Sequence, residues 1–225
     1  MKNILASFFF LFCLSANVMA QTAAAQIEQS DPAATAIFQK VRAKYEAYET
    51  IEVDVAITIE IPEQPKIEQK GNLVQKGDQY RFDLPDQLYI SDGNSLWYYS
   101  KTKNQVQLNS IDEDDEDSMM TPKDLLRVYE REDFFYALTN EYYKKNITVQ
   151  QIELKPRESG GEYKKLRVEI NKKTSEILSV QAFFSDGVRY KVAIDKMTPN
   201  PTKKVSFKFN GVNHPGVKVE DLRID

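Results

Sequence analysis

Residues 50–62 read TIEVDVAITIEIP, and this stretch decides the fold. Its apolar side chains recur at every second position from Ile51 to Ile61, with mostly acidic residues and threonine between them. Successive side chains of a β-strand point to opposite faces of its sheet, so a period of two predicts a long, half-buried strand. We expect one face of this strand to be buried, with side chains Ile51, Val53, Val55 and Ile57.

A helix is expected immediately before this strand. Ser30 or Asp31 can cap it, and Pro32 suits the first helical turn. Apolar residues then recur at helical spacing, including Val41. We predict one amphipathic helix over residues 32–49.

Short strands separated by turn signals continue along the chain. Glycine-containing turns such as Gly77, Gly160-Gly161 and Gly187 separate alternating segments. The expected strands cover residues 71–76, 79–84, 88–91, 96–100, 105–108, 147–154, 164–171, 176–185, 188–195 and 205–210. Residues 134–143 are compatible with helix or strand. We therefore predict an antiparallel sheet of about ten or eleven strands, which at that size tends to curl.

A second helix is expected in the middle of the chain, over residues 119–132. Thr121 can cap it, Pro122 suits its first position, and Leu125 and Leu126 begin an apolar stripe. Met119 and Met120 supply flexible apolar side chains, which adapt to irregular ligands. The predicted fold is mainly β, with two helices covering the concave side of a curled sheet.

The first twenty residues have the features of a cleaved signal peptide. Lys2 is followed by an apolar run and by the small-residue site Val18-Met19-Ala20. Cys13 lies inside the apolar run, and the large Phe12 before it argues against lipid attachment. We expect an exported protein of one domain over residues 21–225, with residues 21–30 a flexible tether.

Composition argues against several kinds of chemistry. The formal net charge is −4, and it becomes −5 once Lys2 is removed, which disfavours a nucleic-acid partner. His214 is the only histidine, so no catalytic triad can be built without it. The acidic run 112–117 lacks the glycine and distal glutamate of a calcium loop. We expect no enzyme activity, cofactor or metal.

Residues 96–99, Leu-Trp-Tyr-Tyr, pose a different question because both faces of such a strand are apolar. Alternation places Leu96 and Tyr98 on one face and Trp97 and Tyr99 on the other. We expect Trp97 to face the concave side and Tyr98 to face outward, with the Asp92-Gly93 turn setting the register.

Four segments, in order, resemble the periplasmic outer-membrane lipoprotein carriers, the LolA family. Residues 90–99, ISDGNSLWYY, are similar to the family's S-D-G-x-x-L-W-x-Y segment, and 71–82, GNLVQKGDQYRF, to its G-x-L-x-x-K run. TPKDLL at 121–126 falls where the family carries its lid helix, and 207–223 is similar to its final strand and tail.

This resemblance implies an unclosed β-barrel whose hollow is lidded by helices. It implies a carrier that shields lipoprotein acyl chains on their way from the inner to the outer membrane. The implied donor is an inner-membrane ABC transporter, the implied acceptor lies at the outer membrane, and we expect a monomer.

Cavity and lid residues follow from matching positions in the motifs and from the strand pattern. Tyr80 and Phe82 match the family's cavity-facing aromatic pair, and Ile51 and Val55 its first-strand positions. The expected cavity set is Ile51, Val53, Val55, Ile57, Tyr80, Phe82, Tyr89 and Trp97, and the lid set is Val41, Met119, Met120, Leu125 and Leu126. Some family members latch the lid through an arginine after the motif lysine. Gly77 stands there in this chain, which leaves nearby Arg81 as the candidate latch.

Three other functions stay open at this point. An outer-membrane lipoprotein receptor would need a lipid-modified cysteine. A carrier or sensor of another envelope lipid or glycolipid could use the same fold. A hydrolase would need a catalytic constellation that the residues do not supply.

Overall fold

A computed structural model describes residues 29–111, 127–158, 160–161 and 163–223. The predicted signal peptide, residues 21–28 of the tether, the acidic run and the lid residues Met119, Met120, Leu125 and Leu126 lie outside this part of the chain.

The first described element is the predicted helix. α1 spans Pro32–Glu46 and ends three residues before the predicted boundary at 49. The Asp31 carboxylate accepts a hydrogen bond from the backbone N–H of Ala33 at 2.8 Å, which satisfies an otherwise unpaired donor of the first turn. The apolar stripe on the buried side consists of Ala34, Phe38, Val41 and Tyr45.

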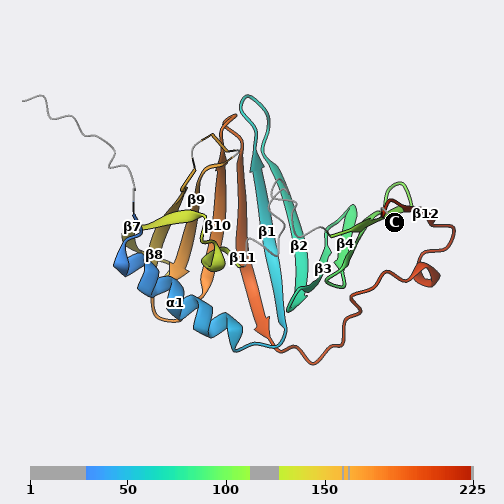
Figure 1. Ribbon diagram of the computed structural model, residues 1–225, viewed down its shortest axis with the longest axis horizontal. Helices are drawn as coiled ribbons and strands as arrows, with labels where there is room; N and C mark the ends of the chain where they lie inside the picture. Colours follow the sequence, from blue (N-terminus) through green and yellow to red (C-terminus); the bar gives the residue numbers. More distant parts are fainter. Residues whose placement is uncertain (1–28, 112–126, 159, 162, 224–225) are drawn as a thin grey trace, which may run out of the picture.

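A single sheet of twelve strands makes up most of the described chain, in the order β12-β6-β5-β4-β3-β2-β1-β11-β10-β9-β8-β7. The bounds are β1 Ile51–Glu60, β2 Ile67–Lys76, β3 Gln79–Asp83, β4 Gln87–Ser91, β5 Ser95–Ser100, β6 Gln105–Ser110, β7 Phe134–Lys144, β8 Ile147–Pro156, β9 Tyr163–Asn171, β10 Ile177–Phe184, β11 Arg189–Pro199 and β12 Lys218–Asp221. β12 runs parallel to β6, and the other neighbouring strands are antiparallel. Because β7 and β12 lie at the two edges and do not pair, the sheet is an open barrel (Figure 1).

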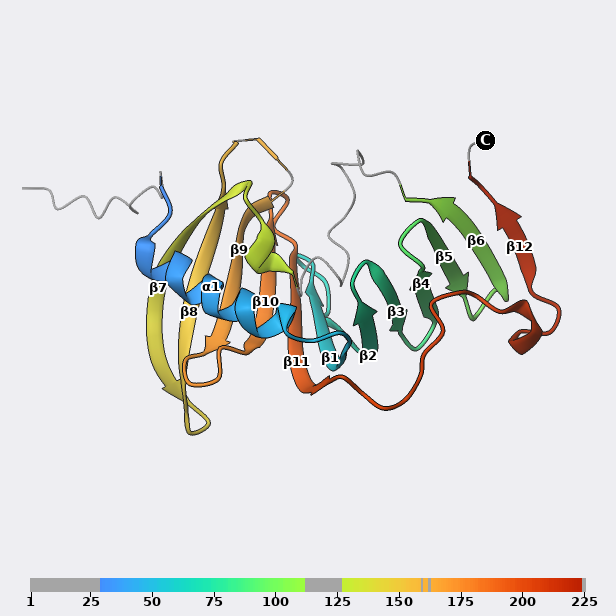
Figure 2. The ribbon, with the colours of Figure 1, turned by 60° about the horizontal axis from the view of Figure 1, so that its bottom comes forward.

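α1 crosses one side of this sheet, over strands β7 to β10, as Figure 2 shows. We call the side that faces α1 the inner face. It carries a large apolar core to which α1, β1, β3 and β8 to β11 all contribute. All four predicted residues of the first strand, Ile51, Val53, Val55 and Ile57, are buried in that core, so the predicted alternation is confirmed.

The opposite side, the outer face, carries a second and smaller cluster. Leu88, Ile90, Tyr99 and Val106 are buried there. They pack against Phe209 and Val217, which belong to the segment between β11 and β12. That segment runs beneath the strands β1 to β6 in the view of Figure 2 before the chain returns as β12.

Two sequence predictions about elements need correction. Residues 205–210 do not form a strand, although their side chains alternate between half-buried and exposed. Val205, Phe207 and Phe209 are the half-buried residues, and Phe209 packs against the outer cluster, so burial of one side of the segment produces the alternation without strand pairing. The predicted helix over 119–132 is also wrong for its described part, since residues 128–130 form one 3₁₀ turn, η1 (Val128–Glu130).

The ambiguous segment 134–143 is resolved as a strand. It forms most of β7, which pairs with β8 along its whole length. The strand count of twelve exceeds the predicted ten or eleven because β7 and the short β12 are added while 205–210 is lost.

Candidate functional site

The inner face is the candidate site, because it gathers most of the buried apolar side chains of the described residues on one side of an open sheet. α1 covers one half of it, from β7 to β10 (Figure 2). The other half, from β1 to β6, has apolar side chains on the same face, and several of these are only half-buried.

α1 is attached to the sheet at both ends. Just before its start, the backbone N–H of Asp31 donates to the Tyr136 carbonyl of β7 at 2.7 Å, and midway along the helix the Phe38 ring meets Tyr136 edge to face, with centroids 5.1 Å apart. Near its end, the Tyr45 hydroxyl accepts a hydrogen bond from the backbone N–H of Ile177 at 3.1 Å. Lys44 also donates to the Glu176 carboxylate at 2.8 Å. These contacts fix the helix across the strands that it covers.

One cross-strand row shows how the inner face changes in character. Directly paired residues share a face, and the row runs Met197, Val53, Leu73, Phe82, Tyr89, Tyr98, Gln107, Glu220. Val53, Leu73 and Phe82 are at most 2% exposed, whereas the residues from Tyr89 onward are half-buried or exposed. The row therefore passes from a dry apolar centre to a polar edge.

Three aromatic rings link the centre of this row to its polar end. The Phe82 and Tyr89 rings stack with centroids 6.5 Å apart, and Tyr89 and Tyr98 follow at 5.1 Å. The Tyr89 hydroxyl donates to the side-chain carbonyl of Gln87 at 3.0 Å. A tyrosine presents an apolar ring and a polar tip, which suits the border between the two regions.

Gly71 on β2 leaves the space that the Phe82 ring occupies. A Cβ at this position would lie 2.8 Å from both the Phe82 ring and the Leu84 side chain. Real carbon atoms do not approach so closely, so the absent side chain lets both residues close over the strand. Close packing of Phe82 and Leu84 thus explains why glycine stands at the first position of the G-x-L motif.

A strip of four half-buried residues lies on the inner face, near one end of each of four neighbouring strands. It consists of Ile59 on β1, Tyr190 on β11, Phe184 on β10 and Tyr163 on β9. Burial raises the pKa of Tyr190 to about 12, and the nearby Tyr89 adds to the shift. Tyr89 is three strands away from β1, so the curl of the sheet brings the two tyrosines into electrostatic range.

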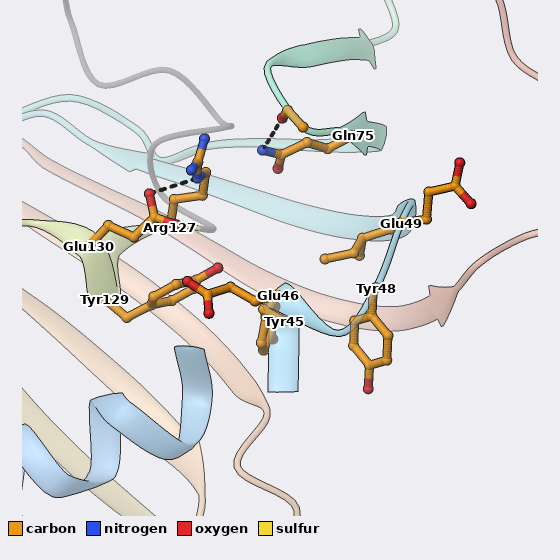
Figure 3. A pocket seen from close by; sticks show the side chains of 10 residues that line it. Tyr45, Glu46, Tyr48, Glu49, Gln75, Arg127, Tyr129 and Glu130 are labelled. Carbon is orange, nitrogen blue, oxygen red and sulfur yellow. Dashed lines mark hydrogen bonds and ion pairs between the residues drawn. The ribbon is translucent and has the colours of Figure 1, made fainter. Parts of the chain in front are cut away.

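A cavity of about 230 Å³ lies where α1 ends. Figure 3 shows Tyr45, Tyr48 and Tyr129 on one side of it and Gln75 of β2 on the other. Arg127 forms an ion pair with Glu130 at 2.8 Å and another with Asp78 at 3.1 Å. The cavity marks the border between the half of the inner face that α1 covers and the half that it leaves open.

Seven of the eight residues predicted for the cavity lie on the inner face, namely Ile51, Val53, Val55, Ile57, Tyr80, Phe82 and Tyr89. The eighth, Trp97, does not. It pairs with Ile90 and Leu108 and packs in the outer cluster, while Tyr98 lies opposite Tyr89 on the inner face. The prediction for 97 and 98 is therefore reversed, because the register of the β4–β5 pair decides between two equally apolar faces.

Arg81, the predicted lid latch, also lies on the other face of the sheet from the one its predicted role requires. It pairs with Val74 and Ile90, which places it on the outer face, away from α1. There it lies 3.9 Å from Asp83 and lines an outer groove of about 960 Å³ with charged residues of both signs. Arg81 and α1 therefore lie on opposite sides of the sheet, whereas the predicted latch needs Arg81 on the inner side.

Of the predicted lid residues, only Val41 falls in the described chain. It is fully buried on the side of α1 that faces the sheet. Several residues of this region were missed, among them Phe38 on α1 and Leu73, Tyr98 and Tyr190 on the inner face. Leu73 could have been found by pairing the predicted strands 71–76 and 79–84. The position of Tyr190 near Tyr89 could not, because it depends on how the whole sheet curls.

The described residues contain no group of three or more acidic, histidine or cysteine side chains arranged to hold a metal ion. Within the same ranges, no helix has the length and apolar character needed to cross a bilayer. His214 stacks on Phe209 with ring centroids 4.9 Å apart and takes part in the outer cluster.

An open, mostly antiparallel sheet that curls around an apolar inner face, with a helix across it, defines the class of half-barrel folds. Residues 50–210 match the family model described as outer membrane lipoprotein carrier protein LolA. The match covers well over half of the chain, so this protein belongs to the LolA family.

Comparison with one solved structure agrees with that fold. A crystal structure of an uncharacterized conserved protein from Thermus thermophilus aligns with a TM-score of 0.52 at 9% identity, over 84% of this chain and 99% of that one. At this identity the likeness shows the fold alone. A LolA superfamily protein from Nitrosomonas europaea aligns with a TM-score of 0.41 at 12% identity, over 76% and 94% of the two chains.

A curated relative, an uncharacterized protein of Methanocaldococcus jannaschii, is 35% identical over 69 residues. These are 31% of this chain and 21% of the relative, so the chain spans about a fifth of that protein's length.

Proposed function

We propose that the protein is a periplasmic carrier that binds the acyl chains of lipoproteins on its inner face and moves them from the inner to the outer membrane. The observation that carries the proposal is the continuity of that face. Apolar side chains extend from the half under α1, through Val53 and Leu73, to the half-buried Tyr89 on β4.

The physical demand for such a carrier is large. Each buried methylene contributes about 0.8 kcal/mol, so a lipoprotein acyl chain does not stay dispersed in water without cover. An apolar face of an open sheet can supply that cover, and the edges of an open sheet can separate to admit chains of different length.

Cargo binding requires α1 to give way to the acyl chains. In the structure the helix fills the covered half with Phe38, Val41 and Tyr45, all buried. When acyl chains leave, these residues can return to the same positions and bury the apolar surface again. The helix then acts as a competitor of the cargo, which makes release energetically acceptable.

Family membership supports lipoproteins as the cargo. We further propose an inner-membrane ABC transporter as the donor and a periplasmic location behind a signal peptide. We propose that the protein makes or breaks no covalent bond. Transport of another acylated envelope lipid uses the same surface and is the principal alternative.

The experiment is release of a triacylated lipoprotein from spheroplasts by the added protein. We expect a soluble complex of lipoprotein and carrier. Tyr89→Glu places a charge on the half-buried part of the inner face and should abolish release, whereas Tyr143→Glu, at a side chain 71% exposed on β7, should not. Release that needs no carrier, or a Tyr89→Glu variant that remains folded by circular dichroism and fully active, contradicts the proposal.

A further inference from the structure

The polar end of the inner face has the composition of a second subsite. A cavity of about 350 Å³ adjoins Tyr98, and its other lining residues are Gln87, Ser100, Thr102, Lys103, Gln105 and Gln107. Tyr98, Ser100, Gln87, Gln105 and Gln107 share the inner face with Phe82, as the strand pairing requires. This volume is within the range of small-ligand sites.

The lining is almost uncharged, since Lys103 is its one ionised residue. Glu220 is the nearest acidic group on the same row, and its carboxylate accepts hydrogen bonds from Gln105 at 3.0 Å and Gln107 at 3.2 Å. A cationic ligand would find no compensating charge in this lining, and an anionic ligand would find only Lys103. A neutral group with carbonyl oxygens would find several donors.

The hydrogen bonds within the site leave donors and acceptors for a ligand. Because the Gln87 carbonyl accepts from Tyr89, its amide nitrogen remains a donor. Gln105 and Gln107 use their amide nitrogens on Glu220, which leaves their carbonyl oxygens as acceptors. Among the described residues, the Tyr98 hydroxyl has no protein partner and lies at the border of the cavity.

We infer that this cavity is a subsite for the uncharged polar linkage of an acylated ligand, meaning the ester or amide carbonyls that join acyl chains to their head group. The chains then lie along Tyr89 and Phe82 towards Leu73 and α1. The aromatic row from Tyr98 to Phe82 connects the two parts, with centroid spacings of 5.1 and 6.5 Å. This inference rests on the proposed carrier function and names the chemistry of its ligand.

Tyr89 and Tyr98 both have a role at the border between the apolar and the polar part of the inner face. A hydroxyl at this point can donate to a carbonyl while its ring contacts the first methylenes of the chain. Tyr98 donates directly, and Tyr89 orients Gln87. The subsite therefore distinguishes an ester-linked chain from a plain hydrocarbon of the same length.

The test compares two probes on the full mature chain, dipalmitoylglycerol and dihexadecylglycerol. They have the same chain length, but only the first has ester carbonyls. We expect the unaltered protein to bind the ester probe more tightly. Tyr98→Phe combined with Gln87→Leu should weaken ester binding about fivefold for each hydrogen bond removed and change ether binding less than about twofold.

A matched control removes one tyrosine hydroxyl and one glutamine amide elsewhere. Tyr143→Phe with Gln150→Leu does so on β7 and β8, at the opposite edge of the sheet, and should leave both affinities unchanged. Equal binding of the two probes by the unaltered protein, or an equal loss of both in the Tyr98 and Gln87 variant, overturns the subsite. If neither probe binds the unaltered protein, the carrier proposal itself fails.

Discussion

Tyr89 and Trp97 lie on neighbouring strands and are both half-buried, yet they point to opposite sides of the sheet. Tyr89 pairs with Tyr98 on the inner face, while Trp97 pairs with Ile90 on the outer face. The two aromatic residues therefore report on two separate environments, one proposed to bind cargo and one that packs against the segment before β12.

Fluorescence of Trp97, the chain's one tryptophan, should be insensitive to cargo. We predict that acyl-chain binding leaves its emission maximum unchanged, because the outer cluster is not part of the binding face. Phe209→Ala should shift the emission to longer wavelength, since Phe209 packs against this cluster. A shift on cargo binding as large as that caused by Phe209→Ala would contradict the assignment of faces.

Tyr45→Phe should destabilise the protein by about 1–3 kcal/mol, because the backbone N–H of Ile177 loses its buried acceptor. The matched change Tyr48→Phe removes a hydroxyl with no hydrogen-bond partner in the described chain and should have an effect within about 0.5 kcal/mol. Urea unfolding of the two variants measures the difference. Equal stabilities would show that the helix is not held to β10 by this bond.

Gly71→Ala should cost about 1–3 kcal/mol, because the added Cβ would lie 2.8 Å from both the Phe82 ring and Leu84. Gly161→Ala is the control, since nothing lies within 4 Å of a Cβ there. Thermal unfolding followed by circular dichroism compares them. If Gly71→Ala proves as stable as Gly161→Ala, Phe82 does not close over β2 as described.

Alkaline pH should destabilise the protein through two tyrosines, the buried Tyr129 and the half-buried Tyr190. Burial raises the pKa of Tyr129 and of Tyr190 to about 12, compared with about 10 in an unfolded chain. A raised pKa means that the unfolded state loses its proton first, so stability is complete below pH 10 and falls as pH rises from about 10 to 12.

Replacing Tyr190 with phenylalanine tests that link. The variant should lose stability with pH less steeply, by at most about 1.4 kcal/mol per pH unit over this window. Phenolate absorbance and urea unfolding at a series of pH values measure the two quantities. An unchanged slope would mean that Tyr190 ionises equally easily in the folded and unfolded states.

The sequence predicts the fold well where one face of a strand is apolar and the other is polar. In residues 51–57 the alternation leaves one choice, and the structure agrees with it. In residues 96–99 both faces are apolar, so the pattern cannot decide between Trp97 and Tyr98. Only the pairing with β4, a contact between strands, settles which residue faces inward.

The same limit explains the error at residues 205–210. Val205, Phe207 and Phe209 alternate as in a strand, but they lie outside any strand, and Phe209 packs against side chains of the outer cluster. A hydrophobic period of two indicates which side chains are buried, but it does not indicate whether the backbone forms hydrogen bonds with a neighbouring strand. The polar subsite next to Tyr98 was likewise hidden, because its residues come from three strands and include glutamines with no motif.

The most direct test of the central claim is site-specific photo-cross-linking from the two opposed aromatic positions. A benzoylphenylalanine is placed at residue 89 in one variant and at residue 97 in the other, and each is irradiated in the presence of a lipoprotein cargo. We predict that the probe at 89 cross-links to the acylated lipoprotein and not to the same protein lacking its lipid, and that the probe at 97 cross-links to neither. Cross-linking from position 97 equal to that from 89, or cross-linking from 89 that persists without the acyl chains, would contradict binding of acyl chains on the inner face.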